Sequence, residues 1–208
     1  KSRTSHSSPK PMRIFIAVEI PEELRNRLSA VAGELAAGLA EQNAAAVLRW
    51  TAQSNYHLTL RFLGETASAQ RQQIGEMLER TTAVCPPLSL TLDGLGAFPN
   101  WRRMRVLWAG VAGDVQRLAG LQREVEVGAQ ACGFAVERQG FHPHATLAYV
   151  NQDAESGLIA QAGTLLAGQT KLAQSLGQWD VSELVLMGSE LRPAGSVYTT
   201  LGRYGLSG

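Results

Sequence analysis

Tyr-His-Leu-Thr-Leu-Arg-Phe-Leu at residues 56–63 has a counterpart in Phe-His-Pro-His-Ala-Thr-Leu-Ala-Tyr-Val at residues 141–150, and these two stretches decide the predicted fold. Each contains a histidine followed two residues later by a threonine, in a setting of apolar residues that is typical of a strand. Because side chains alternate between the two faces of a strand, histidine and threonine share one face and apolar residues occupy the other. The repetition predicts two halves of similar build, each contributing one strand to a shared cleft.

Alternating strands and helices are predicted on both sides of these stretches. Further strands are expected at residues 12–19, 88–98, 105–111, 182–188 and 196–204. Helices are expected from Pro21 onward and at residues 69–84, 114–133 and 153–172. The short connections rich in glycine and proline favour antiparallel pairing, so the predicted fold class is α+β.

Length, charge and cysteine content limit the possible classes of protein. Residues 12–208 are expected to form one bilobal domain, and the polar residues 1–11 a disordered tail, because that segment has little apolar surface to bury. No apolar run approaches the roughly 20 residues that span a bilayer. The net charge of +1 is too weak to hold a long nucleic-acid duplex. Cys85 and Cys132 lack ligand-like spacing and no secretory signal is recognisable, which predicts reduced thiols in a cytoplasmic protein.

The polar faces of the two stretches carry groups suited to phosphodiester chemistry. Strict alternation places Arg61 beside His57 and Thr59, and it places His142 beside His144 and Thr146. Opening a cyclic phosphate needs a base for the attacking water and an acid for the departing oxygen. Imidazole, with a pKa of about 6.5, serves in either state. Threonine hydroxyls can donate hydrogen bonds to the phosphate oxygens.

Neither step needs a metal, and no ligand cluster is recognisable, so no cofactor is expected. A single His-x-Thr pair in a strand is usually a half-buried polar pair without a catalytic role. Two copies among only four histidines make catalysis and a structural role about equally well supported by the pattern alone.

The pair His-Leu-Thr-Leu and His-Ala-Thr-Leu resembles the HxTx signatures of the two-histidine phosphoesterase superfamily. The flanking sequence is similar to the bacterial RNA 2′,3′-cyclic phosphodiesterase branch, historically called 2′-5′ RNA ligase. The similar segments are MRIFIAVEIP at 12–21, RW at 49–50 with NYHLTLRFLGE at 55–65, LGAFPNWRRMRVLWAGV at 95–111, GFHPHATLAY at 140–149 and SELRPAGSVYTTL at 189–201.

This resemblance implies a bilobal α+β fold in which two pseudo-symmetric lobes with antiparallel sheets form a V-shaped cleft. It further implies that His57 is the general acid and His144 the general base, and that Thr59 and Thr146 bind the phosphate. The implied reaction hydrolyses RNA 2′,3′-cyclic phosphate ends to 2′-phosphomonoesters, with weak reverse 2′-5′ joining. The alternative is a non-catalytic module on the same fold that binds RNA or nucleotides. A structural protein with coincidental motifs is the third possibility.

The sequence departs from the family pattern at one position. Members often carry an arginine in HxTLxR, which helps to bind the phosphate, whereas this chain has Tyr149 there. Strict alternation also turns residue 149 away from His144 unless a β-bulge intervenes. Arg61 is therefore the candidate for the missing cation.

The remaining candidates each have a functional and a structural interpretation. Arg102 and Arg103, next to Trp101, either contact RNA beyond its terminal nucleotide or lie in a solvated turn. Phe15 either stacks on a base or lies in the core, and His142 either touches the phosphate or makes a structural hydrogen bond. Trp50 and Trp108 are expected in the core. The expected ligands are RNA ends or cyclic nucleotides, with no membrane contact and no obligate protein partner, and a monomer is expected.

Overall fold

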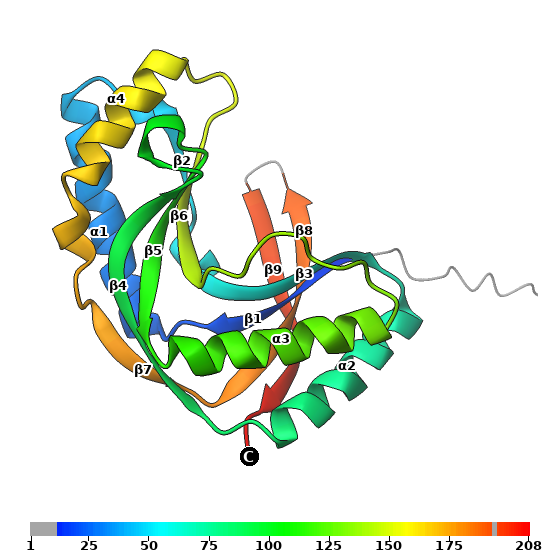
Figure 1. Cartoon of the computed structure of the whole chain (residues 1–208). Helices are drawn as coiled ribbons and strands as arrows, with labels where there is room; N and C mark the ends of the chain where they lie inside the picture. Colours follow the sequence, from blue (N-terminus) through cyan, green and yellow to red (C-terminus); the bar gives the residue numbers. More distant parts are fainter. Residues whose placement is uncertain (1–11, 193–194) are drawn as a thin grey trace, which may run out of the picture.

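A computed structural model describes residues 12–192 and 195–208, so the tail predicted at residues 1–11 lies outside the described residues. The described chain has the predicted α+β class (Figure 1). Its strands are β1 (Met12–Glu19), β2 (Leu48–Trp50), β3 (His57–Thr66), β4 (Leu88–Phe98), β5 (Val106–Gly113), β6 (His144–Val150), β7 (Gly177–Val181), β8 (Glu183–Arg192) and β9 (Gly195–Gly205). Its α-helices are α1 (Glu22–Glu41), α2 (Ser68–Ala83), α3 (Val115–Ala131) and α4 (Ser156–Ala167).

All of the strands belong to one curved antiparallel sheet rather than to two separate sheets. Its order is β7-β4-β5-β6-β3-β1-β8-β9, and β2 pairs with β6. The two strands with His-x-Thr motifs, β3 and β6, lie next to each other in the middle. They pair at a single position, Leu58 with Ala145. The sheet therefore divides into two halves of similar build, and the two motifs lie where these halves meet.

The helices cover the outer face of the curved sheet in two pairs. In Figure 1, α1 and α4 lie together beside the half that contains β4 and β5, and α2 and α3 lie together at the other half. The helix α1 follows β1 but packs beside the half that contains β4 and β5. The helix α3 follows β5 but packs at the half that contains β1 and β3. These crossings tie the two halves together.

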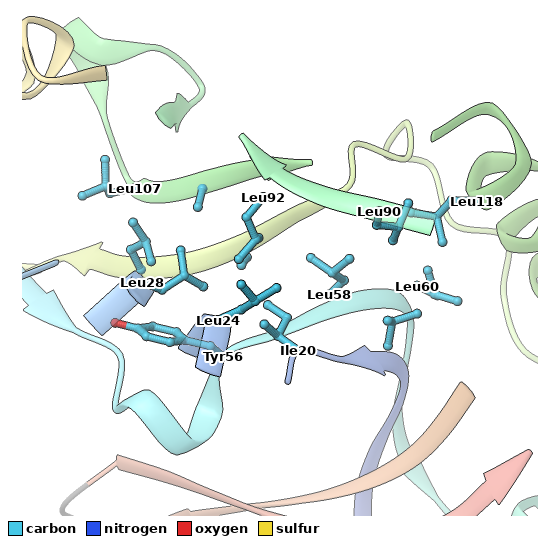
Figure 2. Packing of buried hydrophobic residues seen from close by; sticks show 14 of the residues in the cluster. Ile20, Leu24, Leu28, Tyr56, Leu58, Leu60, Leu90, Leu92, Leu107 and Leu118 are labelled. Atoms are coloured by element: carbon cyan, nitrogen blue, oxygen red, sulfur yellow. The ribbon is translucent and has the colours of Figure 1, made fainter. Parts of the chain in front are cut away.

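A continuous apolar core lies beneath both motifs. Leu58 and Leu60 of β3 pack with Leu28 of α1, with Leu90 of β4 and with Leu118 of α3 (Figure 2). Burial of a leucine side chain contributes about 1.5–3 kcal/mol to folding. Because the apolar residues of β3 and β6 are committed to this core, their histidines and threonines face the opposite side of the sheet.

Most predicted elements are observed with small shifts in their ends. The strands at residues 12–19 and 88–98 coincide with β1 and β4. β6 begins at His144 rather than at residue 141, because Pro143 has no N–H group to donate to a neighbouring strand. α4 ends at Ala167, and residues 170–173 form a separate 3-10 turn. β2 and β7 were not predicted as separate strands, since both are short and carry few apolar residues.

Candidate active site

A bulge in β3 directly after its His-x-Thr-Leu segment determines which side chains reach the cleft. Thr59 pairs with Ala17 of β1, but the next pair joins Arg61 to Ile16, which leaves Leu60 as an extra residue. The extra residue reverses the alternation beyond it. Phe62, which was expected to face inward, is therefore 60% exposed and lines the cleft.

The expectation that Arg61 faces the cleft is wrong, because the bulge turns this side chain to the covered face of the sheet. Arg61 is 7% exposed, and its Nε lies 2.5 Å from Oε2 of Glu126 on α3. It also forms an ion pair with Glu137 and donates a hydrogen bond to the carbonyl of Ala135. Arg61 thus anchors α3 and the segment that follows it beneath β3, and its charge is neutralised there.

An equivalent bulge follows the second motif. Thr146 pairs with Trp108 of β5, and the next pair joins Ala148 to Leu107, so Leu147 is the extra residue. Tyr149 consequently turns toward the cleft and is 41% exposed. Position 149 therefore faces the cleft, and it corresponds to Phe62 in the other half.

The two motifs converge on one cavity of about 250 Å³. It is lined by Thr51, Asn55, His57, Thr59, Phe62, Phe98, Val106, Gln139, His144, Thr146, Tyr149 and Tyr198. Antiparallel pairing of Leu58 with Ala145 places His57 toward Thr146 and Thr59 toward His144. Each histidine therefore faces the threonine of the other motif across an approximate two-fold axis.

Backbone carbonyls fix the protonation pattern of both imidazoles. Nδ1 of His57 lies 2.7 Å from the carbonyl oxygen of Asn55, and Nδ1 of His144 lies 2.7 Å from that of His142. A carbonyl oxygen only accepts hydrogen bonds, so Nδ1 carries the proton in each ring and Nε2 has a free lone pair when the ring is neutral. Thr59 Oγ1 lies 3.0 Å from Nε2 of His57 and donates to it in this state.

Aromatic rings surround each histidine. The ring centroid of His57 lies 4.9 Å from that of Phe15 and 5.2 Å from that of Tyr198. His144 lies 5.0 Å from Phe98 and 6.1 Å from Trp108, also between centroids. Such packing orients the imidazoles and removes water from them.

Of the two interpretations of Phe15 the structure supports burial in the core, whereas Trp108 lies in a different place from that expected. Phe15 is only 2% exposed and packs against His57, so it supports the imidazole instead of offering a free face to a base. Trp108 does not belong to the core. It pairs with Thr146 on the cleft side, where its ring lies 4.7 Å from that of His142. Trp50 packs against the core as expected.

The pKa values of both histidines are lowered. Burial is the main cause for His57, the hydrogen bond to the carbonyl of Asn55 opposes it, and repulsion from His144 lowers the pKa further. For His144, burial again dominates, the carbonyl of His142 opposes it, and the charge of His142 lowers the pKa. Burial disfavours the charged ring, and two cations this close repel each other. The pair therefore favours states in which at most one of the two imidazoles is positively charged.

A cation lies next to the cavity at Tyr149. Arg49 of β2 pairs with Tyr149 across the strands, and its Cζ lies 5.5 Å from the centre of the tyrosine ring. A guanidinium over an aromatic face is held by a cation–π interaction. The sequence pattern did not single out Arg49, because only the bulge in β6 turns Tyr149 toward the cleft.

The other predicted residues lie outside this cavity. His142 lines an adjoining hollow together with His144, while Arg102 and Arg103 are exposed on a 3-10 turn (Trp101–Arg103) farther along. Sequence reasoning missed Asn55 and Tyr198. Asn55 aligns His57 through its carbonyl, and its own Nδ2 donates to the carbonyl of Ser196 at 2.8 Å.

Two properties of the described residues bear on cofactors and membranes. In the ranges 12–192 and 195–208, no group of three or more His, Cys, Asp and Glu side chains is arranged to hold a metal ion. No helix of this part of the chain is long and apolar enough to cross a bilayer.

A curved antiparallel sheet with two facing His-x-Thr motifs defines the two-histidine class of phosphoesterases. The model of the family described as LigT like Phosphoesterase matches residues 18–108 and 111–198, so the chain belongs to this family.

Individual relatives agree with this assignment. An RNA 2′,3′-cyclic phosphodiesterase of Methanothermobacter thermautotrophicus is 30% identical over 91% of this chain and 96% of its own length. One from Aeropyrum pernix is 36% identical over 71% of this chain and 80% of its own length. The crystal structure of Escherichia coli LigT complexed with 3′-AMP has a TM-score of 0.71 at 26% identity, covering 96% of this chain and 100% of that one.

Proposed function

We propose that this phosphoesterase hydrolyses RNA 2′,3′-cyclic phosphate ends to 2′-phosphomonoesters, with His57 as general acid and His144 as general base. The observation that carries the proposal is the convergence of both histidines and both threonines on one cavity, with each Nδ1 held by a backbone carbonyl. The names of the relatives and the nucleotide bound by the E. coli structure support the same substrate class.

The reaction adds one water to the cyclic diester. His144 Nε2 takes a proton from water as the water oxygen attacks phosphorus, and the bond between phosphorus and the 3′-oxygen breaks. His57, protonated at Nε2, gives its proton to the 3′-oxygen, which leaves a 3′-hydroxyl and a 2′-phosphomonoester. His144 then returns its proton to solvent and His57 regains one, which restores the starting state.

The threonines are proposed to stabilise the charge that develops on the non-bridging oxygens. In the free enzyme the hydroxyl of Thr59 donates to His57 Nε2. When His57 is protonated, Nε2 becomes a donor, so the hydroxyl is released and can point its hydrogen at the phosphate. Thr146 occupies the equivalent place beside the other ring. Preorganised donors of this kind account for a large part of catalysis in many enzymes.

The phosphate charge itself would bring His57 into its acid form. Burial lowers the pKa of His57 in the free enzyme. A phosphate anion beside the ring favours the imidazolium and raises this pKa. Arg49, held over Tyr149, is proposed to add a second positive charge near the site where many relatives have an arginine.

Two related functions remain to be distinguished by experiment. Because each step is reversible, the same groups can join 2′-5′ ends weakly, but water greatly outnumbers any RNA hydroxyl in dilute solution. A non-catalytic module would bind RNA without turning it over. The paired, fixed imidazoles favour catalysis.

The test uses an oligoribonucleotide that ends in a 2′,3′-cyclic phosphate, incubated with the protein in EDTA. Mass spectrometry should show a gain of one water, and the new end should resist a phosphatase specific for 3′-phosphates. Both outcomes should disappear in His57→Ala and His144→Ala. Binding without turnover by the wild type would leave the non-catalytic module, and turnover that requires added metal would contradict the proposed mechanism.

A further inference from the structure

Three unpaired arginines surround a hollow outside the catalytic cavity. Arg102, Arg103 and Arg105 are exposed, and together they line a pocket of about 510 Å³ next to the start of α4. None of the salt bridges formed among residues 12–192 and 195–208 includes any of these three side chains. No described Asp or Glu lines the pocket either. Three adjacent free guanidinium groups in a chain of net charge +1 form a local site for anions.

A middle hollow lies between this arginine pocket and the catalytic cavity and adjoins both. This hollow of about 480 Å³ shares Arg105 with the arginine pocket. The same hollow shares four lining residues with the catalytic cavity, namely Phe98, Val106, Gln139 and His144. The three hollows therefore follow one another from His144 to the arginines, and together they are called the groove below.

The middle hollow has the chemistry of a base-binding site. Its walls include the rings of Phe98 and His142, which lie edge to face with centroids 5.4 Å apart. Rings of this kind stack on unpaired bases, and arginines next to them bind the phosphates between bases. An aromatic hollow thus lies next to a cationic pocket, and this combination of groups binds single-stranded RNA.

The arginine turn is held rigidly in place. Asn100 Oδ1 accepts a hydrogen bond of 3.0 Å from the backbone N–H of Arg103. Helix α4 approaches this turn so closely that a Cβ added at Gly163 would collide with the carbonyl oxygen of Trp101. Trp101 itself packs against the core and is not free to stack on RNA. A fixed turn spares the cost of ordering the backbone at binding, so that only the arginine side chains lose conformational freedom.

We infer that this groove binds the nucleotides that precede the terminal cyclic phosphate, so that oligoribonucleotide ends are preferred to nucleoside 2′,3′-cyclic phosphates. The inference rests on the proposed function. A cyclic phosphate occupies the 3′ end of its chain, so all remaining nucleotides lie on its 5′ side. They leave the catalytic cavity through the wall formed by Phe98 and Val106 and run past His142 to the arginines.

The test compares kcat/KM for 2′,3′-cyclic mono-, di-, tri- and hexanucleotides. The wild type should gain about tenfold or more from the mononucleotide to the trinucleotide. The double variant Arg102→Ala/Arg103→Ala should lose this gain and keep its activity on the mononucleotide. For the hexanucleotide, the slope of log kcat/KM against log salt concentration should become shallower by about 1.4. Each phosphate contact on a single strand contributes roughly 0.7 to this slope, and the double variant loses two contacts.

The matched control is Arg80→Ala/Lys171→Ala, which removes two exposed positive charges elsewhere on the molecule. It should keep the length dependence of the wild type. A wild type without length dependence, or equal losses in both double variants, would overturn the groove. Failure of every cyclic substrate, including the mononucleotide, would instead overturn the proposed function. In that case, binding of a fluorescent oligonucleotide, reduced only in Arg102→Ala/Arg103→Ala, would still support the groove.

Discussion

The two motif strands use the same backbone device but differ in what lies around them. Both β3 and β6 have a bulge directly after the threonine of the motif. In each strand the bulge turns an aromatic side chain into the cleft, Phe62 in β3 and Tyr149 in β6. Behind β3, however, the bulge buries a charged Arg61, whereas behind β6 it buries Ala148. His57 is enclosed by Phe15 and Tyr198, while His144 faces a groove. The comparison teaches that a duplicated motif fixes the catalytic geometry, and that its surroundings assign separate tasks to the two halves.

The largest effect is expected from removing either histidine. His57→Ala and His144→Ala should each lower kcat by about 10²–10⁴-fold, which is the range for general acid–base catalysis. A substrate with sulfur in place of the 3′-oxygen separates the roles, since a thiolate leaves without protonation. This substrate should restore activity to His57→Ala and not to His144→Ala. The opposite pattern would exchange the acid and the base between the two halves.

The buried ion pair behind β3 should matter for stability and not for chemistry. Arg61→Met removes the cationic partner of Glu126, which keeps its hydrogen bonds from Gln130 and from the backbone N–H of Glu137. Breaking a buried ion pair on one side costs about 3–5 kcal/mol in the free energy of unfolding, and these hydrogen bonds place the expected loss at the lower end. Urea denaturation measures the loss. Arg117→Ala removes an exposed ion pair with Asp114 and should cost less than about 1 kcal/mol. Similar losses in both variants would show that Arg61 does not anchor α3.

The cleft-facing aromatic positions sharpen the comparison further. Tyr149→Arg should lower KM about tenfold, because a new charge-assisted hydrogen bond to the phosphate is worth about 1.5–3 kcal/mol. Phe62→Arg introduces the same charge at the equivalent position of the other half and should change KM less. Arg49→Ala should raise KM about threefold through loss of the cation over Tyr149. Steady-state kinetics with one oligonucleotide compares all three variants, and an unchanged KM in Tyr149→Arg would mean that residue 149 does not approach the phosphate.

The smallest effect is a displacement of the pH profile. In the proposed mechanism activity needs protonated His57 and neutral His144, and both pKa values lie below the ordinary 6.5. Raising the pH past the lowered pKa of His57 removes its proton, so kcat/KM should already decline below pH 6.5. Lowering the pH protonates His144, so kcat/KM should also fall on the acid side, with apparent pKa values that belong to the pair. Imidazole titration by NMR should give values below 6.5 in the free protein and a higher value for His57 with phosphate bound. Titration of either ring above 6.5 in the free protein would contradict this expectation.

The site was predictable from sequence up to the point where strict alternation fails. Period-two spacing was enough to place His57 beside Thr59 and His144 beside Thr146, because each pair precedes its bulge. The same spacing misplaced Arg61 and Phe62, because both follow the bulge in β3. For Tyr149 it could say only that the side chain would face the cleft if β6 had a bulge. A bulge depends on the register with a partner strand, and the partners β1 and β5 are distant in the chain. Asn55 was missed because it acts through its backbone carbonyl, which no side-chain pattern reveals.

The sequence by itself determined the α+β class, the strands of the two motifs and the two histidines that we propose as the acid–base pair. These features rest on local periodicity and on a repeated motif, and both can be seen in the order of residues. Only the tertiary structure decided that one curved sheet joins the halves at Leu58 and Ala145 and that Arg61 is neutralised by Glu126. It also placed the arginine pocket beside the hollow that His144 lines. The physical reason is that register, burial of charge and continuity of a surface depend on contacts between segments that the chain brings together only on folding.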